Sequence, residues 1–131
     1  MKDLFSPARR AAMVKNLSAG AHGHNIWPEL RVGDNDWTIH KNRFSAFVNG
    51  SSNLTERLRE ADIDTLIITG TLTDVCCESS ARDAMMLNFK VVMVTDANAA
   101  SCDEDHNGAL NALARLFADV ISTDDLIERI K

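Results

Sequence analysis

The sequence has few cysteines, no long hydrophobic run and no excess of basic side chains. Its three cysteines, Cys76, Cys77 and Cys102, are odd in number and two are adjacent, which argues against a disulfide framework and predicts reduced thiols. No apolar run approaches the ~18 residues that span a bilayer, and the first ten residues lack the apolar region of a secretory signal. We therefore expect a cytoplasmic protein without a membrane partner.

The charge balance is acidic, with 14 basic and 19 acidic side chains and a net charge of −5. Nucleic-acid-binding proteins concentrate Lys and Arg on one face, whereas here acidic residues interrupt the basic ones throughout. No nucleic-acid partner is expected. A chain of 131 residues, 45% of them hydrophobic, can bury one core but not two independent ones, which predicts a single domain over residues 1–131.

Helical and strand patterns alternate along the chain. Continuous apolar runs at residues 66–68 and 91–94 are typical of strands buried on both faces of a parallel sheet, and shorter strands are expected at 37–40 and 120–121. Helices are expected at residues 7–19, 53–61, 73–88, 104–118 and 124–130, with Thr73 placed to cap the third, and a long loop at 20–36. The alternation predicts a three-layer α/β/α sandwich with a mainly parallel, Rossmann-type sheet of four strands.

One segment at a strand end has the composition of a nucleophile site. In open parallel sheets ligands bind beyond the carboxyl ends of the strands, and residues 70–78, GTLTDVCCE, follow the first long strand and place Cys76 in the first turn of a helix. Backbone N–H groups and the helix dipole stabilise a thiolate there and could hold an oxyanion. The alternative is that Cys76 fills the core as a small apolar residue, which is the interpretation kept for Cys77 and Cys102.

Lys41 is the second candidate, since it ends another predicted strand and so lies at the same edge of the sheet. A lysine beside a cysteine favours the thiolate, although most lysines are solvated surface charges. His22 and His24 form a short pair with no third ligand at metal-binding spacing, so we expect neither a metal nor a cofactor. His40 and His106 have no evident partner in the sequence.

Three segments resemble the isochorismatase-like cysteine hydrolases, a family that includes amidases, nicotinamidases and isochorismatases. Residues 41–47, KNRFSAF, are similar to the family's lysine segment, residues 64–83 to its nucleophile strand, turn and helix, and residues 91–100 to its next strand and loop. The similarity extends from about residue 5 to the end of the chain.

The resemblance implies a role for each matching residue. Cys76 would be the nucleophile and Lys41 its activator, with a cis peptide bond between Thr71 and Leu72. The remaining assignments are an oxyanion hole formed by the backbone N–H groups of Leu72 and Cys76, and a pocket formed or supported by Phe44 and Phe47.

The family's proton-shuttling aspartate lies at the end of its first strand, and no segment before Lys41 matches that strand. The resemblance therefore implies an N-terminally truncated domain that lacks the family's two central strands. Either the chain closes up by pairing its first strand with another neighbour, or a second chain supplies the missing strands, or the residues are a fragment. Free strand edges favour a homo-oligomer.

Two functions remain open. The first is hydrolysis of the C–N amide bond of a small molecule through a thioester at Cys76, and the second is a catalytically inactive remnant or assembly module of the same fold. A flavodoxin-like or response-regulator-like domain also fits the alternation, but the sequence lacks a phosphate-binding glycine loop and an acidic cluster ending a first strand.

Overall fold

The computed structural model describes residues 5–131, which divide into two compact units, one ending at Trp37 and one formed by Thr38–Lys131. The first unit contains helix α1 (Pro7–Leu17) and a short 3₁₀ helix (His22–His24). Helix α1 buries none of its residues. The single domain over residues 1–131 stays a prediction.

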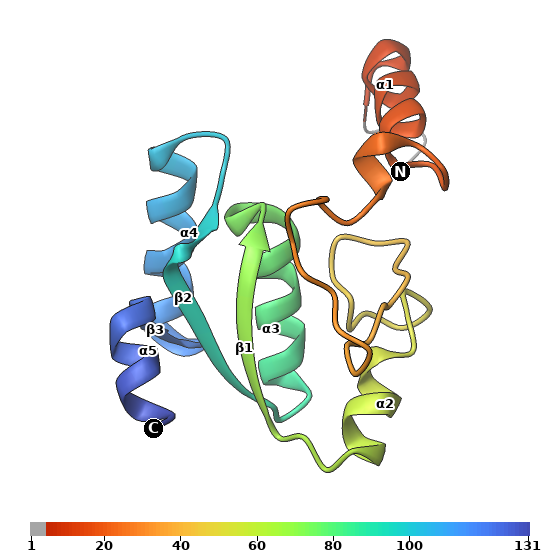
Figure 1. The fold of residues 1–131 in the computed structure, drawn as a ribbon. Helices are drawn as coiled ribbons and strands as arrows, with labels where there is room; N and C mark the ends of the chain where they lie inside the picture. Colours follow the sequence, from red (N-terminus) through yellow and green to blue (C-terminus); the bar gives the residue numbers. More distant parts are fainter. Residues whose placement is uncertain (1–4) are drawn as a thin grey trace. The chain divides into compact units, whose positions relative to one another are not determined.

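The second unit is built on a parallel sheet of three strands, β1 (Thr65–Thr71), β2 (Lys90–Ala99) and β3 (Asp119–Ile121), in the order β1-β2-β3 (Figure 1). The register of β1 against β2 shifts between Ile68 and Gly70. The Asn98 side chain spans this irregularity, since its Nδ2 donates to the carbonyls of Ile68 at 2.9 Å and Val94 at 2.6 Å. The predicted parallel α/β architecture is confirmed.

The helices of this unit are α2 (Leu54–Glu60), α3 (Glu78–Met86), α4 (Asp103–Leu116) and α5 (Thr123–Arg129), close to the predicted positions. Alternate residues of β2, Val91 and Met93, are buried in one core with side chains of α2, α3 and α4, namely Leu58, Ala81, Ala84, Leu110 and Leu113. Burial of Val91, Met93 and Val94, with Val92 half-buried, explains the apolar run in β2. The candidate residues lie at the carboxyl ends of β1 and β2.

The predicted fourth strand is wrong. Residues 37–40 form no strand in the described chain, and the two strand pairs are β1 with β2 and β2 with β3. An extended segment needs a neighbouring strand for its N–H and C=O groups, and residues 37–40 join neither pair. Lys41 therefore follows an irregular segment, and β1 is left as an edge strand.

Candidate active site

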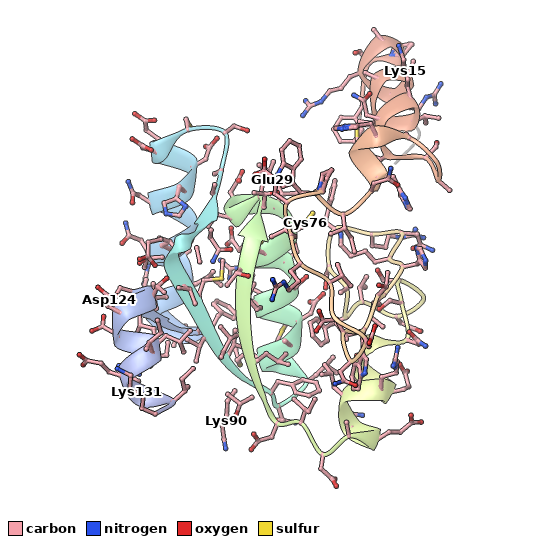
Figure 2. All side chains as sticks on the ribbon, in the orientation of Figure 1. Lys15, Glu29, Cys76, Lys90, Asp124 and Lys131 are labelled. Atoms are coloured by element: carbon pink, nitrogen blue, oxygen red, sulfur yellow. The ribbon has the colours of Figure 1, made fainter. Side chains whose placement is uncertain are left out.

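The turn after β1 presents Cys76 at the carboxyl end of the sheet. The Thr71–Leu72 peptide bond is cis, at the position that the resemblance implies. The Leu72 carbonyl then accepts the N–H groups of Val75 and Cys77, both at 3.1 Å, and residues 73–77 form a π-helical turn that leads into α3. The expected helix over residues 73–88 thus begins with a wider turn, which leaves Cys76 half-buried beyond the end of β1 (Figure 2).

Lys41 lies against the Cys76 thiol although 35 residues separate them. Its Nζ donates to the carbonyls of Arg43 at 2.9 Å and Phe44 at 3.1 Å, and to Cys76 Sγ at 3.6 Å. An ammonium group has three N–H donors, so the two carbonyls hold the group and the third donor faces the sulfur. The contact therefore places a positive charge directly beside the Cys76 sulfur.

A cavity of about 350 Å³ adjoins the pair. Most of its lining is apolar, and residues of β1 form part of its wall. Phe47 lines it and is buried, whereas the Phe44 side chain is 38% exposed and contributes only its carbonyl, which holds Lys41. The lining comprises Lys41, Ala46, Phe47, Leu54, Leu66, Ile67, Ile68, Thr69, Thr71, Cys76, Cys77 and Ser80.

The three cysteines have free thiols but different surroundings. Cys77 is buried, and this burial is the main cause that raises its pKa from 9.0 to about 11. Cys77 therefore remains a thiol at neutral pH. Cys102 is exposed at the start of α4.

Thr73 does not cap the helix as the sequence predicts. Leu72 occupies the N-cap position, and the Thr73 hydroxyl shares a hydrogen bond of 2.9 Å with Nδ1 of His106 in α4. No local spacing in the sequence connects His106 with Thr73, because the two residues are 33 positions apart.

No group of three or more His, Cys, Asp or Glu side chains within residues 5–131 is arranged to hold a metal ion. None of the helices in that same stretch is long and apolar enough to cross a membrane.

The family model described as "Isochorismatase domain" matches residues 2–125 of this chain. An uncharacterized isochorismatase family protein of Bacillus subtilis, YwoC, is 32% identical over 104 residues, covering 79% of this chain and 54% of that protein. Nicotinamidase 3 of Arabidopsis thaliana is 36% identical over 91 residues, covering 70% and 45%.

A solved structure shares the fold as well. The isochorismatase-like hydrolase from Alkaliphilus metalliredigens superposes with a TM-score of 0.80 at 33% identity, covering 86% of this chain and 61% of that one. The chain spans about half the length of the curated relatives that it matches.

Proposed function

The chain belongs to the isochorismatase family, and from that membership we propose that it is a cysteine hydrolase acting on the amide C–N bond of a small molecule. The observation that carries this proposal is the 3.6 Å contact between Lys41 Nζ and Cys76 Sγ at the wall of a cavity. A nucleophile, a charge that favours its reactive form and a space for substrate are thereby combined at one strand end.

In the proposed reaction the Cys76 thiolate attacks the amide carbonyl carbon. The backbone N–H groups of Leu72 and Cys76 stabilise the oxyanion that forms on the carbonyl oxygen. The C–N bond then breaks, the nitrogen takes up a proton and leaves as ammonia or an amine, and an acyl thioester remains on Cys76. Water attacks the thioester, which releases the carboxylic acid and restores the thiol.

The cavity favours a small, largely apolar acyl group. Its volume lies at the low end of the roughly 300–1,000 Å³ found for ligand pockets, and Phe47, Leu54 and Leu66 are among the apolar side chains that line it. The name of one relative, nicotinamidase, indicates an aromatic carboxamide as the first compound to test. The sequence predicts a cytoplasmic protein with reduced thiols, and only a reduced Cys76 can act as the nucleophile.

The second candidate is an inactive remnant or assembly module of the same fold. General acid–base catalysis contributes roughly 10² to 10⁴-fold to rates, so an inactive chain would differ strongly from an active one in the amide assay below.

We also propose that the free edge of β1 mediates homo-oligomerisation. Within residues 5–131 β1 pairs with β2 alone, Ile67 is 47% exposed, and residues 65–71 carry no charged side chain or proline. Charges and prolines are the features that natural edge strands use to prevent association. Analytical ultracentrifugation should find a dimer or larger assembly that Ile67→Lys converts to monomers, and a monomeric wild-type chain would refute the proposal.

Ammonia release from a panel of primary amides, nicotinamide included, tests the hydrolase proposal. We expect turnover by the wild-type chain, loss of that turnover in Cys76→Ala, and a Cys76 acyl adduct in intact-protein mass spectra. The matched control is Cys102→Ala, which should retain activity because Cys102 lies outside the cavity lining. If the wild-type chain and Cys76→Ala release ammonia equally slowly from every amide, the inactive alternative is favoured.

A further inference from the structure

The contact between Thr73 and His106 joins the nucleophile turn, residues 73–77, to helix α4, which begins 30 residues after Thr73. Thr73 is the first residue of the π-helical turn and its side chain has no exposed surface. A buried hydroxyl needs a hydrogen-bond partner, because leaving it unpaired costs free energy. His106 supplies that partner from α4, at 2.9 Å.

His106 is well placed to hold the turn. It occupies the first turn of α4, where its N–H donates to the Cys102 carbonyl at 3.1 Å. The helix behind it is anchored in the core by Leu110 and Leu113, which are buried. The imidazole is therefore attached to a fixed element and has few rotatable bonds.

Three side-chain contacts connect the turn with its surroundings. Cys76 meets Lys41 at 3.6 Å, Cys77 meets the Thr69 carbonyl at 4.0 Å, and Thr73 meets His106 at 2.9 Å. Both contacts to sulfur are long, and Lys41 is exposed. The Thr73–His106 contact is the short one, and it lies three residues before the nucleophile.

We propose that His106 is a positioning residue for the nucleophile turn. Through Thr73 it fixes the direction in which the turn presents the Cys76 thiol and the Leu72 N–H. Misplacing reacting groups by about 1 Å can cost 10²-fold in rate, so the contact should affect reactivity more than it affects folding. The proposal rests on the assignment of Cys76 as the nucleophile, but its test needs no substrate.

The test measures the alkylation rate constant of Cys76 by iodoacetamide, followed on the Cys76-containing peptide by mass spectrometry. Thr73→Val removes the hydroxyl at constant shape and His106→Leu removes the ring nitrogen. Each should lower the rate roughly fivefold, the loss expected for one hydrogen bond. The double variant should react no more slowly than either single variant, because both changes remove the same interaction.

Two further variants keep the proposal falsifiable if His106→Leu folds poorly. His106→Asn places a polar group near the former Nδ1 and should restore the rate to within twofold of wild type, as should Thr73→Ser, which keeps the hydroxyl. Asn107→Ala, at the next and exposed position of α4, is the matched control and should leave the rate unchanged.

The proposal is overturned if His106→Leu and Thr73→Val alkylate within twofold of wild type, or if their effects multiply in the double variant. Where an amide is hydrolysed, the same variants should lower kcat with little change in KM. A chain that alkylates as expected but hydrolyses no amide would refute the proposed function and leave the role of His106 intact.

Discussion

Replacing Lys41 tests the electrostatic basis of the candidate site. Lys41→Met keeps a side chain of similar length and removes the charge that lies 3.6 Å from Cys76 Sγ. Because a cationic neighbour favours the thiolate, and the thiolate is the form that alkylating reagents attack, the variant should react more slowly at neutral pH.

The size of the effect follows from the distance and the exposure of the pair. Two unit charges 3.6 Å apart attract by about 1 kcal/mol at a dielectric constant of ~80 and by about 2 kcal/mol at ~40. Lys41 is exposed and Cys76 is half-buried, so dielectric constants in this range, close to that of water, are appropriate for the pair. The attraction corresponds to a roughly 5- to 30-fold slower alkylation of Cys76.

The assay compares Cys76 with Cys102 in the same molecule. Both thiols are labelled with iodoacetamide at pH 7 and quantified in separate peptides, so the ratio of their rates cancels reagent and concentration errors. Cys102 is exposed and its rate should not change. Lys90→Met is the matched control, since Lys90 pairs with Asp64 at 2.7 Å beside the amino end of β1 (Figure 2).

A structural explanation is separated from an electrostatic one by Lys41→Arg. This variant keeps the positive charge and can still donate to the carbonyls of Arg43 and Phe44, so it should fall between wild type and Lys41→Met. The reasoning is refuted if Lys41→Met leaves the ratio of Cys76 to Cys102 alkylation within twofold of wild type while thermal unfolding is unchanged.

Three further predictions concern stability. Leu113→Ala should lower the free energy of unfolding in urea by about 2–5 kcal/mol because Leu113 is fully buried, whereas Leu116→Ala, at a position 78% exposed on the same helix, should change it by under about 0.5 kcal/mol; equal losses would contradict the core described here. The folded state raises the pKa of Cys77 to about 11 by burial, so stability should fall as pH rises from 9 toward 11, and Cys77→Ala should flatten that part of the profile in chemical denaturation. Hydrogen bonds from the Thr123 hydroxyl and N–H lower the pKa of Asp96, so their contribution is present above the unfolded pKa and is lost as pH falls through the folded value; Thr123→Val should unfold at a higher pH in acid titrations, and an unchanged midpoint would contradict this.

Local patterns predict which segments are strands but not how fully each strand is covered. The apolar runs at residues 66–68 and 91–94 lie inside β1 and β2. β2 buries Val91, Met93 and Val94, whereas the edge strand β1 leaves Ile67 47% exposed. The segment at residues 37–40 has strand-like residues but no partner strand. Strand formation depends on that partner, which a local pattern does not reveal.

The same distinction applies to the candidate site. Cys76 is predicted because its turn follows a strand end. Lys41 is predicted from a strand at residues 37–40, which the structure lacks, and from the family resemblance, so only the family pattern supports that prediction. The hydrogen bond between Thr73 and His106 joins positions 33 apart. From the sequence alone a threonine before a helix is predicted to be an N-cap, and only the packing of α4 reveals its other partner. Long-range contacts of this kind follow from the tertiary structure alone.

The adjacent cysteines have a consequence for oxidative damage. A sulfenic acid on Cys76 would be repaired by a second thiol, which must be deprotonated to attack it. Cys77 is next in sequence, but with a pKa of about 11 it is almost entirely protonated at neutral pH. Recovery of an oxidised Cys76 would therefore depend on a small thiol such as glutathione entering the cavity from solution.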